Sequence, residues 1–161
     1  MTEEGLTDEM YTEGMMVDES IIAIILIFGL IALLIGIISY IVVAYSYMVM
    51  ANNSGIENSW LAWIPLANLW IIGELVSERL NNKGGLIYLL VTLANTVIFL
   101  FIPIIGILSG IAFLIFTIYI YYLVFKKFSN NPILHTIFSF IIPLYVVIVL
   151  FVIRNNRPAK I

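Results

Sequence analysis

The sequence has no cysteine and a single histidine, His135, in 161 residues. Without cysteine, disulfides, thiolate metal sites and cysteine nucleophiles are excluded. Charged residues are also scarce, at 11% of the chain, whereas an ordinary soluble domain has about 25%. Hydrophobic residues make up 63%, and a domain of about 150 residues leaves roughly a third of its surface exposed. A chain this apolar cannot present a polar surface to water, so the composition predicts an integral membrane protein with lipid as its solvent.

Basic residues are absent before Arg79, and acidic residues are absent after Glu78. Residues 1–20 hold seven acids and no base, the opposite of the basic start of a signal peptide. They predict a solvated acidic tail outside the cytoplasm, with contact to a cation or a partner as the alternative. The seven bases fall in short clusters at the ends of apolar segments. Such clusters are typical of residues that set membrane orientation, and they indicate no nucleic-acid site.

Familiar catalytic patterns are missing too. The chain has no G-x-S-x-G, no H-E-x-x-H, no P-loop and no Rossmann glycine pattern. A lone histidine without cysteine or an intramembrane carboxylate pair does not favour a metal site. The expectation is a protein that is not an enzyme and that has no cofactor.

Two long apolar stretches predict three membrane-spanning helices, since a span needs about 20 apolar residues. Residues 21–50 form the first span, and residues 86–125, which carry no charge, form two more as a helical hairpin. Pro103 is expected to end one helix of this hairpin, and Gly106 to help start the next. Small residues in the spans favour close helix neighbours; they are Gly29, Ala32, Gly36 and the pair Gly106 and Gly110.

All three tryptophans lie between residues 52 and 72. A helix over 61–76 would be about 24 Å long, too short to cross about 30 Å of hydrocarbon. Tryptophan favours the membrane interface, so this stretch predicts a helix lying at the cytoplasmic face. One face of that helix would carry Trp60, Trp63, Ala67, Trp70 and Glu74. Proline is best tolerated in a first turn, however, which would start the helix near Pro65 and leave Trp60 and Trp63 ahead of it.

Residues 133–153 are long enough to cross the membrane, but Pro143 divides them into two halves of about 15 Å each. A crossing helix and a re-entrant or interfacial segment both stay open. The distribution of bases favours the second. If 61–76 and 133–153 both return to the side that they left, all seven bases share one side, and if both cross, the bases divide four to three.

The expected fold is therefore all-α and polytopic, with about three to four transmembrane helices in one domain over residues 21–161. A proline-broken interfacial or re-entrant helix follows the first span, and a second lies near the C-terminus if 133–153 does not cross. The expected location is the cell membrane, with the N-terminus outside and the basic loops and C-terminus in the cytoplasm.

An internal repeat relates two parts of the chain. An offset of 78 residues aligns NNSGIENSWLAWIPL, which starts at Asn52, with NNPILHTIFSFIIPL, which starts at Asn130. Pro65 then matches Pro143, and the spans ahead of both segments end in tyrosines. The alignment predicts a repeated unit made of a span, an Asn-Asn corner and a proline-broken segment.

Several polar side chains are candidates for chemistry, each with a plainer role beside it. His135 could carry protons or sense pH, or simply lie at the interface. Glu74 and Glu78, four apart on a helix, could bind a cation or a proton if buried, or be solvated beside Arg79. Asn95 lies in the middle of a span and predicts a hydrogen bond to another helix, with a pathway for ions or solutes as the alternative.

The stretch WLAWIPLANLW resembles a W-x-A-x-I-P-x-x-N pattern in small bacterial multi-span membrane proteins of uncharacterised function. The matching residues are Trp60, Ala62, Ile64, Pro65 and Asn68. The later stretch KKFSNNPILHTIFSFIIP is similar to that family's phenylalanine-and-basic corner with its following IP segment, although the family usually has glycine where this chain has Ser129. The resemblance covers roughly residues 30–153. It implies this architecture and a bacterial plasma membrane, and it implies no activity and no catalytic residue.

The missing catalytic motifs and the small-residue packing faces together predict a protein that works in the lipid bilayer through other membrane proteins or itself. An accessory subunit, or a protein of the stress or immunity type, fits this description. The alternative is a small oligomeric transporter or channel for an ion or small solute, because transporters use broken segments near the midplane. The candidate functional or packing residues are Trp60, Trp63, Pro65, Asn68, Trp70, Glu74, Asn95, His135 and Pro143.

Overall fold

The computed structural model describes residues 19–161, and over this range every regular element is a helix. The predicted all-α class is therefore confirmed. The predicted acidic tail lies outside the described residues, apart from Glu19 and Ser20, which open the first helix. The chain forms two compact units that meet between Ile38 and Ser39. The expectation of one domain over residues 21–161 therefore stays a prediction.

Among residues 19–161, three helices are long enough and apolar enough to cross a membrane: α2 (Glu19–Asn53), α4 (Gly84–Phe101) and α5 (Pro103–Phe128). They correspond to the three predicted spans. The 35 residues of α2 give a length of about 50 Å, more than the roughly 30 Å of hydrocarbon. The first unit holds only the N-terminal part of this helix among the described residues, and therefore has no second element to pack against.

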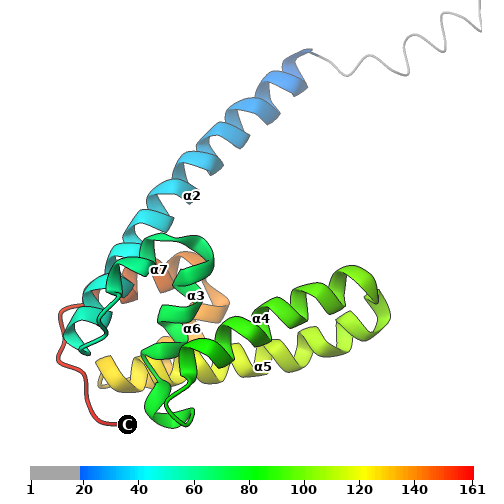
Figure 1. The fold of residues 1–161 in the computed structure, drawn as a ribbon. Coiled ribbons are helices and arrows are strands. Elements are labelled where there is room, and N and C mark those ends of the chain that lie inside the picture. Colours follow the sequence, from blue (N-terminus) through cyan, green and yellow to red (C-terminus); the bar gives the residue numbers. More distant parts are fainter. Residues whose placement is uncertain (1–18) are drawn as a thin grey trace, which may run out of the picture. The chain divides into compact units, whose positions relative to one another are not determined.

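Helices α4 and α5 lie side by side as a hairpin (Figure 1). Pro103 is the first residue of α5, where its missing N–H costs nothing, so the second helix begins there and not near Gly106 as expected. Gly106 instead allows the close crossing, because a Cβ at this position would lie 2.7 Å from Phe99 Cα. A Cβ at Gly110 would meet nothing within 4 Å. The predicted Gly106–Gly110 pair is thus a packing site within the chain only at Gly106.

The tryptophan-rich stretch is not one helix. It forms a 3-10 turn, η1 (Ser59–Trp63), then α3 (Pro65–Glu74) and a second 3-10 turn, η2 (Ser77–Arg79). Ile64 between the first two is extended, as residues before proline usually are. The start of the helix at Pro65 is confirmed. The prediction of one continuous helix face from Trp60 to Glu74 was wrong, since Trp60 and Trp63 precede the helix.

This stretch runs back along α2 before it returns. The hydroxyl of Tyr40 donates to the Trp63 carbonyl at 2.7 Å, and the Trp63 indole N–H approaches Met48 Sδ at 3.2 Å. Tyr40 precedes the end of α2 at Asn53 by 13 residues, which is about 20 Å of helix. The chain therefore reverses direction at Pro65, about two-thirds of a hydrocarbon thickness away from the end of α2.

The C-terminal segment also reverses. Helix α6 (Pro132–Ile141) and helix α7 (Pro143–Ile153) are separated by the extended residue Ile142, so the predicted break at Pro143 is confirmed. Each helix is about 15–17 Å long. The chain beyond α7 comes back to the end of α5, where Asn156 Nδ2 donates to the Phe128 carbonyl at 2.8 Å and the Ala159 N–H to the Lys127 carbonyl at 2.8 Å.

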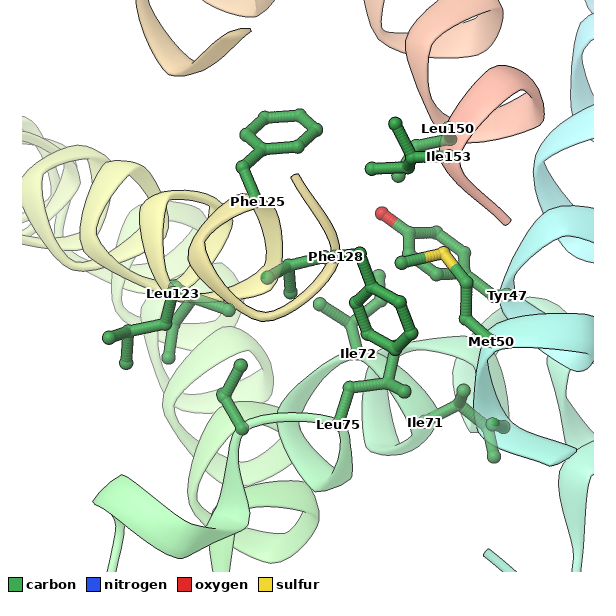
Figure 2. Close-up of a cluster of buried hydrophobic side chains, with 14 of the residues drawn as sticks. Tyr47, Met50, Ile71, Ile72, Leu75, Leu123, Phe125, Phe128, Leu150 and Ile153 are labelled. Atoms are coloured by element: carbon green, nitrogen blue, oxygen red, sulfur yellow. The ribbon is translucent and has the colours of Figure 1, made fainter. Parts of the chain in front are cut away.

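The core of the second unit contains residues that the internal alignment places at equivalent positions. Five positions on α2 and α3 or just after α3 are buried, and so are the five positions 78 residues later on α5 and α7. Figure 2 shows most of these side chains pointing into one cluster from the four elements. The aligned pairs are Tyr47 and Phe125, Met50 and Phe128, Ile71 and Val149, Ile72 and Leu150, and Leu75 and Ile153. Both halves of the predicted repeat therefore contribute aligned residues to one buried cluster.

Candidate acidic pocket

A polar pocket of about 420 Å³ lies where α3 and α5 end. We call it the acidic pocket, because three of its side chains are carboxylates: Glu57, Glu74 and Glu78. The loop over residues 54–58 forms one wall, and the remaining lining comes from Trp70, Ser77 and Lys127. Each carboxylate can carry one negative charge and Lys127 one positive charge, which gives this small volume a net charge of about −2 at neutral pH.

Lys127 is the most constrained charge in the pocket, with only 6% of the residue exposed. Its ammonium group donates to the Leu75 carbonyl at 2.9 Å and to Glu78 Oε1 at 2.9 Å. The hydrogen bond from Lys127 and its positive charge hold the pKa of Glu78 below the usual value for a glutamate. The ion pair therefore joins the end of α5 to the turn after α3. Sequence reasoning missed Lys127, because it assigned Lys126 and Lys127 alike to a basic cluster that sets membrane orientation.

Glu74 and Trp70 lie together over the start of α4. Glu74 Oε2 accepts a hydrogen bond from the Gly85 N–H at 3.1 Å. A carboxylate at a helix N-terminus is favourable, since the first N–H groups of a helix have no partners within it. Gly85 also makes room for the indole, because a Cβ there would lie 2.6 Å from Trp70 Cδ1. Glu74 is thus neither fully solvated nor held by a cation: it stabilises the start of α4 and lines the pocket.

The pocket can hold a positively charged group. Glu57 is exposed on the loop, and the half-buried Trp70 offers an aromatic ring beside the carboxylates. Carboxylates attract a cation electrostatically, and a tryptophan face adds a cation–π attraction of about 0.5–1 kcal/mol at exposed sites. Over residues 19–161, no group of three or more histidine, aspartate, glutamate or cysteine side chains has the arrangement to hold a metal ion.

Other predicted residues lie outside this pocket. Asn95 lines a groove on the α4–α5 hairpin. Pro143 begins α7. His135 on α6 is 2.7 Å from the Tyr145 hydroxyl on α7 (Nδ1 to Oη), and its ring lies 5.7 Å from that of Phe125. This contact ties the two arms of the proline-broken segment together, so His135 has a clear packing role.

The W-x-A-x-I-P-x-x-N residues build the chain reversal at Pro65. Ala62 is fully buried, and Asn68 Nδ2 donates to the Ala62 carbonyl at 2.8 Å. The Asn68 N–H also donates to the Ile64 carbonyl at 2.7 Å. Asn68 therefore fastens the turn from both its side chain and its backbone, whereas Trp60 is exposed. Comparisons with protein-family models, curated proteins and solved structures find no match to this chain.

Proposed function

We propose that the protein is a non-catalytic membrane subunit that binds a basic segment of another protein in its acidic pocket. The observation that carries this proposal is the pocket itself, which is lined by Glu57, Glu74 and Glu78 together with Trp70. An arginine or lysine of a partner matches both features, since its charge pairs with the carboxylates and its apolar stem can cover the indole.

The proposed orientation places this pocket in the cytoplasm. The ends of α2, α5 and α7 are joined by hydrogen bonds, including one from Asn53 Nδ2 to the Arg154 carbonyl at 3.1 Å. Bases follow α3 and α7 closely, and two lysines lie in the last turn of α5. If α2, α4 and α5 cross and the two proline-broken segments return, all seven bases share one side, as the positive-inside rule requires. The N-terminus then lies outside.

Fusion reporters test this orientation. A reporter that is active only outside the cytoplasm should work when it is fused at residue 1 and fail at residues 82, 129 and 161. An external signal at residue 82 would mean that residues 61–76 cross. An external signal at residue 161 alone would mean that residues 133–153 cross as a broken helix.

The pocket proposal predicts binding of short arginine- or lysine-rich peptides. We would use the full chain in nanodiscs of uncharged lipid, with Trp60 and Trp63 changed to phenylalanine so that Trp70 is the only fluorophore of its kind. A basic peptide should change the Trp70 fluorescence in a saturable way, and the apparent affinity should fall with added salt, since exposed charges are screened. A peptide of the same length with acidic residues should leave the signal unchanged.

Glu57→Lys is the decisive variant, because Glu57 is exposed and no described hydrogen bond depends on it. It should weaken peptide binding about twofold to thirtyfold, since it replaces an attraction of about 0.2–1 kcal/mol by a repulsion of similar size. Glu19→Lys makes the same charge change at the start of α2 and should leave binding as it was. Equal binding by both variants would place the peptide elsewhere and reject the pocket as the site.

The competing function, a small transporter or channel, receives less support. Transporters built from repeats bind their substrate where the repeats meet. Here the cluster to which both halves of the predicted repeat contribute is filled by apolar side chains such as Met50, Phe128 and Leu150. Solute flux through liposomes that contain only this protein would favour the transporter.

A further inference from the structure

The polar side chains on the α4–α5 hairpin differ in how they are satisfied. Thr92 donates to the Tyr88 carbonyl at 2.7 Å, Thr96 to the Thr92 carbonyl at 2.9 Å, and Ser109 to the Gly106 carbonyl at 3.1 Å. Each of these hydroxyls therefore bonds its own helix. Asn95 Oδ1, in contrast, is shielded from solvent and has no hydrogen-bond partner among residues 19–161.

Thr117 Oγ1 on the same hairpin is also buried without a hydrogen bond of ordinary geometry, but the Tyr88 side chain on α4 lies close enough to interact with it. A threonine hydroxyl in a helix can rotate to a carbonyl one turn earlier, as Thr92 and Thr96 do. A carboxamide has two donors and an acceptor that one such bond cannot satisfy. Asn95 is therefore the polar group of the hairpin that most needs a partner from outside the chain.

The depth of Asn95 in the membrane makes an unsatisfied carboxamide energetically costly. It lies 11 residues after Gly84, which is about 17 Å along a span whose hydrocarbon environment is about 30 Å thick. Neither lipid tails nor bulk water offer a hydrogen bond at that depth, where an unsatisfied group costs several kcal/mol. Asn95 also lines a groove of about 270 Å³ between the two helices, together with the small residues Ala94, Ser109 and Ala112. Small residues let another backbone come close.

We propose that a second copy of this chain docks on the Asn95 groove and that each Asn95 carboxamide turns out of its shielded position to hydrogen-bond to the other. Copies inserted in the same orientation are related by a two-fold axis along the membrane normal, so each residue meets its own counterpart at the same depth. A carboxamide is complementary to itself, because each Nδ2 donates to the other Oδ1. A second copy thus supplies the required polar group at the required depth. The interface is separate from the acidic pocket, and its test does not depend on the function proposed above.

Cysteine cross-linking in native membranes tests the face that is used, and the chain has no cysteine of its own to interfere. Val91 and Ile98 line the groove one turn to either side of Asn95. Val91→Cys and Ile98→Cys should form disulfide-linked dimers under mild oxidation. Leu93→Cys and Val97→Cys lie at similar depths about 160° away around α4, and both positions are exposed to lipid. They should remain monomeric. Equal cross-linking on both faces, or none on the groove face, would overturn the proposal.

Loss of the carboxamide tests the pairing itself. Asn95→Leu replaces the carboxamide by an apolar side chain of similar size, so the variant should insert and fold. Its dimerisation constant, measured by energy transfer between labelled copies as lipid is added, should fall about threefold to twentyfold, the range measured for hydrogen bonds between membrane helices. Thr96→Val is the matched control, because Thr96 bonds only its own helix, and it should dimerise like the native chain. An unchanged constant for Asn95→Leu would show that Asn95 does not pair and would reject this interface.

Discussion

Replacing Gly73 or Gly84 with alanine should remove most of the folded protein. A Cβ at Gly73 would lie 2.7 Å from the Gly84 carbonyl carbon and 2.7 Å from Tyr88 Cβ, and a Cβ at Gly84 would lie 2.8 Å from Ser77 Cα. Real Cβ atoms do not come within 3.0 Å of such neighbours. Most of these neighbours are backbone atoms, which cannot rotate away as the end of a flexible side chain can. Helix α3 would therefore have to move off α4.

The cost should reach the upper end of the range for overpacked positions, about 3 kcal/mol or more. The separation would also pull Trp70 and Glu74 away from the start of α4, so the acidic pocket would open as well. Size-exclusion chromatography in detergent should show little monodisperse Gly73→Ala or Gly84→Ala protein, and what remains should unfold at a clearly lower temperature.

Gly110→Ala is the matched control for this pair. It makes the same change inside a helix, but a Cβ at Gly110 meets nothing within 4 Å, and alanine favours the helix by about 1 kcal/mol over glycine. The variant should therefore be as stable as the native chain or slightly more stable. Native-like stability of Gly73→Ala would contradict the backbone contact between α3 and α4.

Lys127→Met should destabilise the protein by about 2 kcal/mol, and Lys126→Met should have almost no effect. The first change removes both hydrogen bonds of the ammonium group and leaves the Leu75 carbonyl without a partner, at a typical cost of about 1–3 kcal/mol. Lys126 is exposed. A loss of 2 kcal/mol corresponds to about 4–8 °C in the unfolding temperature for a chain of this size. Equal unfolding temperatures of the two variants would contradict the buried position of Lys127.

Acid should reduce the difference in unfolding temperature between the native chain and Lys127→Met. The pKa of Glu78 is lowered in the folded protein, chiefly by the hydrogen bond from Lys127. The ion pair therefore stabilises the fold fully at pH values above the ordinary glutamate pKa, and this contribution is lost as the pH falls through the lowered pKa. Glu78 is 45% exposed, so water weakens the pair and the effect should be modest. Melting curves at neutral pH and at about pH 3 should show a smaller difference in unfolding temperature at the lower pH. A constant difference would assign the effect of Lys127 to its hydrogen bond with the Leu75 carbonyl alone.

The elements themselves could be predicted from the sequence because their causes are local. Long uncharged apolar runs predict spans from length alone, and α2, α4 and α5 appear where those runs lie. A proline lacks an N–H and disfavours the helical conformation in the residue before it. The breaks ahead of Pro65, Pro103 and Pro143 follow from this, as does the extended backbone at Ile64 and Ile142.

Only the tertiary structure decided which of two adjacent residues contacts a residue that is distant in the sequence. Lys126 and Lys127 are chemically identical in the sequence, but successive residues point about 100° apart on a helix. Only the position of Leu75 and Glu78, about 50 residues away along the chain, makes one lysine buried and leaves the other in solvent. In the same way, Gly73 differs from Gly110 only because another backbone crosses it. Local patterns fix the period of a helix, whereas the side of that helix that becomes buried depends on contacts between segments that the sequence keeps apart.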